Sequence, residues 1–371
     1  TEYPILYNFL PKTYAGATYT AEYLTPLWSL PSSFPTPGQA KVTNNYVVIW
    51  NASSNFNDVS SDEQYLSVTS KSYAVVLDLA TGNVLANVTG EGVFALSSMQ
   101  KVLNYSGKFS PNGKRLYCVN YKGYETSWTG TRNFVIDLPT MQSYTVDVSQ
   151  FMNLAYSGED FTFGVMDYTG DHFVSIYFGG ALTNAFYYRY WELNYTTNSY
   201  SYKGNFDGDY WQGAEELQRH VLSPDGTTFV RYSVRSNEVA FYRYNATSNT
   251  SNMFFYRWSK TVSGFPNTSE ILADTTGFQI IAFMRGSLIT IGTYDTQSNT
   301  FTTFFNQSFS PSDFGYSSGS ISWSYPKTYY DWWNPSGRPT TLAFISAPIA
   351  IGGVNYYPAV VYVDGTIFKV N

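Results

Sequence analysis

Residues 315–319 read G-Y-S-S-G, which is the spacing of a nucleophile elbow. Such an elbow exposes a serine at a strand-to-helix turn, and the histidine of the triad follows an acid later in the chain. Here the segment is rich in Ser and Gly, and no helix is expected after it. Both histidines, His172 and His220, precede Ser317. The sequence therefore does not support hydrolase chemistry.

Metal chemistry has equally little support. Two histidines about fifty residues apart and a single cysteine do not form a zinc or iron ligand set by spacing. Asn205, Asp207 and Asp209 alternate as the oxygen ligands of calcium loops do. However, Gly208 occupies a position unlike that pattern. We therefore predict a solvated acidic loop here, and neither a metal nor another cofactor.

Aromatic side chains beside acids could instead bind a sugar or a protein. Trp faces stack on sugar rings, and Trp and Tyr anchor protein interfaces. In a propeller, the loops between blades and the loops joining the second and third strands share one face. Tyr and Trp packing between blades is an equally good interpretation. The candidate binding residues are Tyr124, Glu125, Trp128, Asp207, Asp209, Tyr210, Trp211 and Trp258.

These loops belong to a hairpin pair that recurs about six times, at intervals of roughly 50 to 70 residues. Each unit holds two apolar runs joined by a Gly, Asn or Asp turn, then two more joined by a second turn. The first turns are residues 43–45, 110–113, 167–170, 223–226, 274–277 and 334–337. The second turns are residues 80–82, 139–141, 195–198, 246–249, 295–298 and 364–365.

The runs between these turns predict strands, because they are short and rich in β-branched and aromatic residues. No segment has the period of a long amphipathic helix. A ring protects the edges of such sheets and buries their faces. We therefore predict an all-β fold, a six-bladed β-propeller of four-stranded antiparallel blades over residues 38–371. Residues 1–37 hold six prolines, which predicts an extended N-terminal arm, packed on the ring or donated to a partner, or a strand completing the first or last blade.

Two of the first turns resemble known repeats. Phe109 to Tyr117 reads F-S-P-N-G-K-R-L-Y, and Leu222 to Phe229 reads L-S-P-D-G-T-T-F. Both resemble the SPDG-turn repeats of the TolB, YVTN and dipeptidyl-peptidase propeller families. The resemblance implies a fold and no activity. The peptidases with such propellers carry catalysis on a separate hydrolase domain, which has no counterpart in this sequence.

Charged residues make up only 13% of the chain, against about 25% in ordinary soluble domains, and aromatic residues reach 19%. A surface of neutral polar groups suits an exterior whose pH is low or variable. A net charge of −6 without a basic run gives no footprint for nucleic acid. The single cysteine, Cys118, lies in an apolar run and is expected to be a small buried hydrophobe.

Glycosylation acceptors and composition both point to an exported protein. No apolar stretch is long enough to span a bilayer, and a chain that begins at Thr1 is compatible with a removed signal peptide. The composition, rich in Tyr, Asn and Thr, resembles that of secreted and virion-surface proteins of thermoacidophilic archaea. The acceptor triplets begin at Asn51, Asn87, Asn104, Asn194, Asn245, Asn249, Asn267 and Asn306.

We therefore expect a non-enzymatic extracellular or virion-surface glycoprotein. It would act as a structural or adhesive subunit of a surface layer, filament or virion, through its propeller faces and N-terminal arm. Its partners would be other protein subunits or surface glycans. The alternative is a carbohydrate-binding or carbohydrate-active protein with a site at the channel mouth. A third interpretation is an intracellular interaction platform, because fold alone does not decide function.

Overall fold

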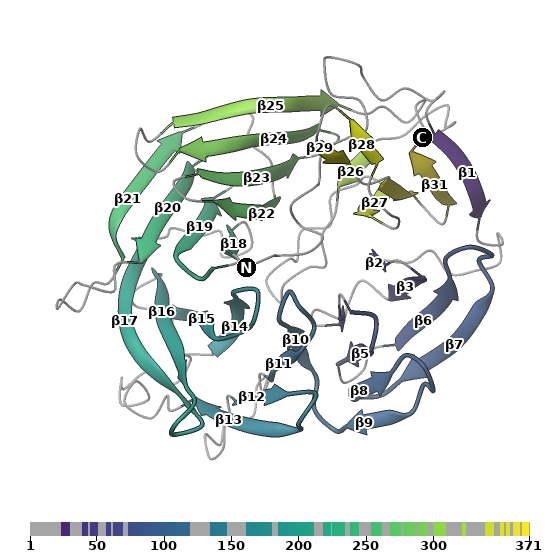
Figure 1. Cartoon of the computed structure of the whole chain (residues 1–371), viewed down its shortest axis with the longest axis horizontal. Helices are drawn as coiled ribbons and strands as arrows, with labels where there is room; N and C mark the ends of the chain where they lie inside the picture. Colours follow the sequence, from purple (N-terminus) through teal and green to yellow (C-terminus); the bar gives the residue numbers. More distant parts are fainter. Residues whose placement is uncertain are drawn as a thin grey trace.

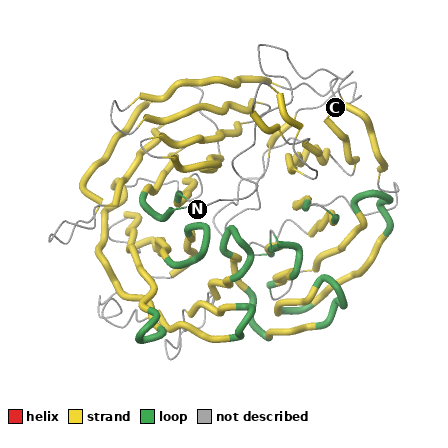
Figure 2. The backbone as a smooth tube through the Cα atoms, viewed as in Figure 1, coloured by secondary structure: helices red, strands yellow, loops and turns green. Residues whose placement is uncertain are grey.

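Strands and turns alone make up the part of the chain that the structure describes, and no helix occurs there (Figures 1 and 2). The computed structural model describes residues 24–29, 39–43, 45–50, 57–60, 62–69, 73–118, 134–146, 161–179, 185–210, 218–223, 225–233, 238–244, 254–261, 268–275, 278–285, 288–295, 300–308, 321–323, 338–344, 349–351, 354–356, 359–363 and 366–370. The sheets are arranged around a central axis (Figure 1). The all-β prediction is confirmed.

Two four-stranded sheets share the first part of the chain. Group A contains, in sheet order, β2 (Gln39–Val42), β3 (Tyr46–Trp50), β6 (Tyr73–Asp78) and β7 (Val84–Thr89). Group B contains β4 (Asp58–Val59), β5 (Tyr65–Val68), β8 (Gly92–Ala95) and β9 (Lys101–Leu103). The chain adds one hairpin to each sheet in turn. The second hairpin of group A therefore follows the first hairpin of group B along the chain.

The next eight strands form one continuous sheet built from two meanders. Group C contains β10 (Gly107–Phe109), β11 (Arg115–Cys118), β12 (Phe134–Asp137) and β13 (Gln142–Val146). Group D contains β14 (Phe161–Met166), β15 (His172–Gly179), β16 (Ala185–Asn194) and β17 (Ser199–Tyr210). The outer strands β13 and β17 pair in parallel, with Thr145 opposite Ser199 and Val146 opposite Tyr200. This pairing covers two edges that would otherwise be open.

The remaining strands continue around the axis (Figure 1). Group E contains β18 (Gln218–Leu222), β19 (Thr228–Ser233), β20 (Glu238–Tyr244) and β21 (Phe254–Thr261). Group F contains β22 (Thr268–Thr275), β23 (Phe278–Arg285), β24 (Leu288–Asp295) and β25 (Thr300–Ser308). Group G contains β1 (Leu24–Ser29), β31 (Thr366–Val370), β30 (Ala359–Val363), β27 (Arg338–Phe344) and β26 (Ile321–Trp323). A separate hairpin joins β28 (Ile349–Ile351) and β29 (Val354–Tyr356).

Six equal four-stranded units are not confirmed. The hairpins around residues 43–45 and 80–82, which the sequence treats as one unit, do form one four-stranded sheet, group A. Residues 39–103 also build a second sheet, group B, that the sequence analysis does not include. The hairpin of β4 and β5 was missed because β4 contains only two residues. Of the segment predicted as an arm, β1 pairs antiparallel with β31, so the first and last described strands lie in one sheet.

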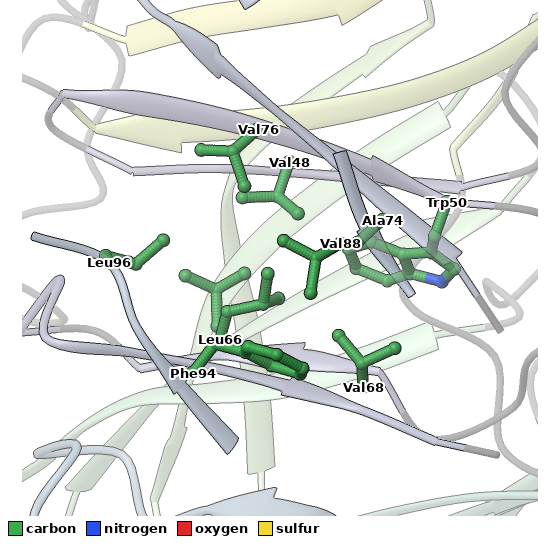
Figure 3. Packing of buried hydrophobic residues seen from close by; sticks show 10 residues of the cluster. Val48, Trp50, Leu66, Val68, Ala74, Val76, Val88, Phe94 and Leu96 are labelled. Carbon is green, nitrogen blue, oxygen red and sulfur yellow. The ribbon is translucent and has the colours of Figure 1, made fainter. Parts of the chain in front are cut away.

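The core lies between neighbouring groups. Between groups A and B it is mostly aliphatic, with Phe94 and the fully buried Trp50 as its aromatic side chains (Figure 3). In β11 successive side chains serve two boundaries: Leu116 and Cys118 pack with Val93 of group B, and Tyr117 packs with Phe173 of group D. Alternation along a strand produces this division. Because both faces of the inner strands β3, β6 and β11 are buried, these strands are apolar almost continuously. Cys118 of β11 is the buried hydrophobe that its sequence context predicts.

Four turns that join the first and second strands of a group share one hydrogen-bond pattern. They are residues 60–65, 110–115, 167–172 and 223–228. From here on, the name first turns refers to these four. In the turn at Ser110, the hydroxyl oxygen accepts from the amide of Arg115 at 3.0 Å, and the amide of Gly113 donates to the Ser110 carbonyl at 2.8 Å. Gly113 adopts φ +75°. Small oxygen-bearing side chains and glycine are therefore what this geometry requires.

The other three first turns vary the same pattern. Ser223 and Ser60 accept from the amide five residues later at 2.9 Å, and at 167–172 the carboxylate of Asp167 replaces the serine hydroxyl and accepts at 3.1 Å. The turn at Ser60 was not recognised in the sequence, because Glu63 holds the position with positive φ, at +59°. Glycine was the signal on which the sequence reading depended.

A tryptophan of β1 fastens the closing strand to group A. The indole N–H of Trp28 donates to the carbonyl of Leu79 at 2.6 Å. A Cβ on Gly82 would lie 2.6 Å from Cδ2 of Trp28, and Gly82 adopts φ +73°. The turn between β6 and β7 therefore requires glycine, both for its backbone and for the ring that packs on it.

Replacing Gly82 by alanine tests this contact. We expect Gly82→Ala to lower the free energy of unfolding by about 3 kcal/mol, because it adds backbone strain and a clash with Trp28. Gly90→Ala is the matched control, since Gly90 has φ +85° but no atom within 4 Å of the added methyl group; it should cost about 1 kcal/mol. Denaturant unfolding of both variants gives the comparison, and equal losses would show that Trp28 does not fasten β1.

Candidate functional site

The binding residues predicted from the sequence lie largely beyond what the structure describes at side-chain level. Tyr124, Glu125, Trp128 and Trp211 fall outside the described residues. Asp207, Asp209 and Tyr210 belong to β17, and Trp258 belongs to β21. The acidic loop expected around Asn205 is therefore a strand, in which Tyr210 is still paired with Ala185 of β16. Both strands are outer strands of neighbouring groups (Figure 1).

Three of the glycosylation acceptors are exposed on the outer part of the ring. Asn87 lies on the edge strand β7, and Asn104 lies at the bend after β9. Asn194 ends β16, where its side-chain oxygen accepts from the amides of Thr196 and Thr197 at 2.9 and 3.3 Å. Asn306 lies in β25. The remaining acceptors, outside the described residues, are Asn51, Asn245, Asn249 and Asn267.

The polar groups that the structure does bring together lie where the first turns of neighbouring groups meet. Between groups A and B, the backbone and side-chain nitrogens of Asn45 each donate to Glu63 at 2.6 Å. Between groups B and C, Lys114 pairs with Asp62 at 2.9 Å. A Cβ on Gly113 would lie 2.7 Å from the Asp62 carboxylate, so glycine also permits this approach.

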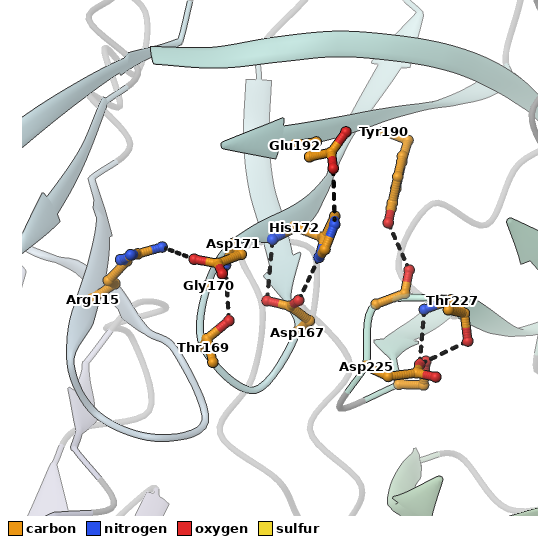
Figure 4. A network of polar contacts seen from close by, with 12 residues as sticks. Arg115, Asp167, Thr169, Gly170, Asp171, His172, Tyr190, Glu192, Asp225 and Thr227 are labelled. Atoms are coloured by element: carbon orange, nitrogen blue, oxygen red, sulfur yellow. Dashed lines mark hydrogen bonds and ion pairs between the residues drawn. The ribbon is translucent and has the colours of Figure 1, made fainter. Parts of the chain in front are cut away.

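The contacts continue toward groups D and E. The amide of Asn112 in group C donates to the carbonyl of Tyr168 in group D at 3.0 Å. The hydroxyl of Tyr190 in group D donates to the carbonyl of Gly226 in group E at 2.8 Å (Figure 4). From group A to group E, each described boundary therefore carries at least one hydrogen bond or ion pair at a first turn.

Arg115 is the centre of the boundary between groups C and D. Its guanidinium nitrogens bind Asp171 at 2.5 Å and the hydroxyl of Tyr195 at 2.9 Å, and that hydroxyl donates to Asp171 at 2.6 Å. The rings of Tyr144 and Tyr195 lie 5.3 and 5.6 Å from the guanidinium carbon. Burial would lower the pKa of Arg115, but the bonds to Tyr195 and Asp171 raise it above its usual value. The side chain is a permanent, buried cation.

His172 is the centre of the boundary between groups D and E (Figure 4). Its Nδ1 lies 2.7 Å from Asp167, which is 3% exposed, and its Nε2 lies 3.7 Å from Glu192. Glu192 also pairs with Lys203 at 2.9 Å. The imidazole stacks on the ring of Tyr190, with centroids 5.7 Å apart and planes 11° apart.

These contacts are suited to holding a proton on the imidazole. Both ring nitrogens of His172 face carboxylates, and no hydroxyl or thiol is recorded as its partner among the described residues. No group of three His, Cys, Asp or Glu side chains that could hold a metal ion occurs among them either. The sequence search missed Arg115, Asp171 and His172. The string D-Y-T-G-D-H at 167–172 was read only as a turn, although it concentrates charge in a chain that has little.

Comparisons with known proteins find likeness in fold and no family. No protein-family model and no curated protein matches the chain. Hsv2 of Kluyveromyces lactis is 13% identical, with 74% of this chain and 87% of that chain covered and a TM-score of 0.45. The β-propeller domain of Cps50 (Swd1) from Myceliophteria thermophila is 8% identical, with 90% and 99% covered and a TM-score of 0.43. The Dos1 propeller is 13% identical, with 88% and 73% covered and a TM-score of 0.40. Likeness at this level says nothing of activity or partners.

Adjacent residues of group C allow the buried and exposed ion pairs to be compared. We expect Arg115→Gln to lower the free energy of unfolding by about 2 to 4 kcal/mol, because it leaves Asp171 without its cation and both tyrosine rings without their neighbour. Lys114→Gln breaks the pair with Asp62, but the lysine side chain is 51% exposed, so the loss should stay within about 1 kcal/mol. Denaturant titration measures both values, and equal losses would contradict a special role for Arg115.

Proposed function

We propose that the strand groups are the blades of a β-propeller, with groups A to G as seven blades in place of the six expected from the sequence. Four described groups are four-stranded sheets, and the eight-stranded sheet divides into two four-stranded meanders. Group G, which contains both β1 and β31, would close the ring. Closure of this kind leaves short edges only.

On this scaffold we propose a non-enzymatic extracellular glycoprotein, a structural or adhesive subunit of a surface layer, filament or virion. The observation that carries the proposal is the pairing of exposed acceptor asparagines with exposed apolar side chains. Asn104 precedes Tyr105, which is 52% exposed, and Asn194 precedes Tyr195, which is 59% exposed. A glycan at each site would cover the neighbouring apolar surface and keep it soluble.

The edge strand β7 supports the same interpretation. Val84 and Leu85 are each 48% exposed on this strand, which has no partner on its outer side in the described sheet, and Asn87 follows them. An open apolar edge promotes pairing between chains. A glycan at Asn87 would block that pairing and leave the propeller faces for protein subunits or surface glycans.

Composition supports an exterior location. The surface depends on neutral polar groups, since 13% of the residues are charged, and such groups do not titrate as the surrounding pH changes. A net charge of −6 argues against nucleic acid as a partner. Among the described residues, no helix is long and apolar enough to cross a membrane. The compositional likeness to surface proteins of thermoacidophilic archaea is part of the proposal.

Intact-mass measurement of native protein tests the glycoprotein. We expect added mass that enzymatic or chemical deglycosylation removes, and the loss of one glycan in each of Asn87→Gln, Asn104→Gln and Asn194→Gln. Asn334→Gln is a control, because the proline after Asn334 excludes it as an acceptor. A native mass equal to that of the bare polypeptide would overturn the extracellular glycoprotein and favour the intracellular platform.

Electron microscopy of the native source tests the structural role. We expect to find the chain in an ordered layer, filament or virion, in the many regularly placed copies typical of a structural subunit. Chromogenic glycosides offered to the purified protein should remain uncleaved. Specific turnover that Asp209→Asn abolishes would overturn the proposal in favour of a carbohydrate-active protein.

A further inference from the structure

His172 touches both groups at the boundary between D and E. Within group D its Nδ1 lies 2.7 Å from Asp167, whose other oxygen accepts from the His172 amide at 3.1 Å. On the side of group E, a Cβ added to Gly226 would lie 2.9 Å from the same Nδ1. The first turn of group E therefore lies directly against the imidazole, at a distance that only glycine allows.

Tyr190 extends this contact across the boundary. Its ring stacks on His172, its hydroxyl donates to the carbonyl of Gly226 at 2.8 Å, and its other neighbour is the ring of Tyr244, with centroids 4.4 Å apart. Gly226 thus receives a hydrogen bond from the tyrosine and a packing contact from the histidine. Any change that loosens the imidazole also removes support from this part of the boundary.

The charges around His172 are mostly negative. Asp167, Asp171 and Glu192 face it from group D, and Asp225 lies beside Gly226 in the first turn of group E. The hydroxyls of Tyr190 and Tyr244 add no charge. Arg115 pairs with Asp171, and Lys203 pairs with Glu192. Among the described cations, His172 is therefore the one that remains to pair with the buried carboxylate of Asp167.

The geometry favours the protonated imidazole. With both nitrogens protonated, one N–H points at Asp167 and the other at Glu192, 3.7 Å away. When the ring loses a proton, either a nitrogen lone pair faces Glu192 or Asp167 loses its donor. A buried carboxylate without a cationic partner is costly.

From this arrangement we propose that His172 links groups D and E through a contact that depends on its protonation, here called the tie. Protonated His172 holds Asp167, supports Tyr190 and keeps the first turn of group E against group D. Loss of the proton weakens this boundary and lets the turn at Gly226 open. The tie is independent of the proposed surface role and exists whether or not the chain is glycosylated.

The direction of the pH dependence follows from two pKa shifts. Burial lowers the pKa of His172, but the bond to Asp167 and the charges of Asp167, Glu192 and Asp171 raise it more, to a net value above 6.5. Burial also raises the pKa of Asp167, which its bond to His172 only partly offsets. In both cases the folded chain holds protons more tightly than the unfolded chain. The stabilisation is therefore full below pH 6.5 for His172 and is lost as the pH rises through its folded pKa.

Histidine NMR tests the first half of the proposal, because the chain has only two histidines. With 13C-labelled histidine, His220→Gln assigns the two signals. We expect His172 to titrate with a midpoint above pH 6.5, and Asp167→Asn to move that midpoint below 6.5. Should Asp167→Asn fail to fold, Glu192→Gln changes a 40% exposed side chain and should lower the midpoint by a smaller amount. A midpoint at or below 6.5 in the unaltered protein would overturn the tie.

Amide hydrogen exchange tests the second half. After correction for intrinsic exchange, we expect the equilibrium constant for the opening of residues 225–228 to increase as the pH rises from 6 to 9. The total increase should be about tenfold for each pH unit by which the folded midpoint of His172 exceeds 6.5. His172→Gln should open faster at pH 6 and show no such pH dependence, whereas His220→Gln should behave as the unaltered protein does. Residues 73–78 of β6 provide an internal reference far from the boundary. A pH dependence that survives in His172→Gln would refute the proposal.

Discussion

Burial of both faces of the inner strands in groups A to D is the constraint on which the rest of the described structure depends. A four-stranded antiparallel sheet with two apolar faces is not stable alone, so each group needs a neighbour on either side. Tyr117 and Leu116 show how one strand serves two neighbours by alternation. Groups A and B meet this need by exchanging hairpins, and groups C and D by also joining their outer strands. The pairing of β1 with β31 then brings the first and last described strands into one sheet.

Sequence reading predicts this architecture where local chemistry is decisive. The turns at Ser110 and Ser223 have the hydrogen bonds that their Ser, Asx and Gly residues imply. The turn at Ser60 has the same geometry without glycine, since Glu63 adopts the positive φ there and its carboxylate accepts two hydrogen bonds from Asn45. The exchange of hairpins between groups A and B and the parallel pairing of β13 with β17 are long-range choices. No local residue pattern specifies them, so spacing alone does not determine how the hairpins are divided among the sheets.

The site was harder to predict than the fold, for a reason visible in β17. Tyr200, Tyr202 and Phe206 alternate with polar residues, which is a strand signal. The same period of two places Asn205, Asp207 and Asp209 at the spacing of calcium ligands. One pattern therefore predicts both a strand and an acidic loop, and the strand is the one that forms. Arg115 and His172 were missed in the sequence for other reasons. Arg115 meets Asp171 only because group D lies against group C. His172 meets Asp167 within its own turn, but the residues of that segment also match an ordinary turn.

Among the described residues, several charged side chains lie where neighbouring groups meet. Only 13% of the residues are charged, yet Lys114 pairs with Asp62 between groups B and C, and Arg115 pairs with Asp171 between groups C and D. A buried ion pair adds little net stability compared with apolar packing, but a mismatched one is strongly unfavourable. Apolar faces that are alike could pack in more than one order. The polar contacts differ at each boundary from group A to group E: amide with carboxylate, lysine with aspartate, arginine with aspartate and tyrosine, and tyrosine with a backbone carbonyl. In the observed order, all of these groups find partners.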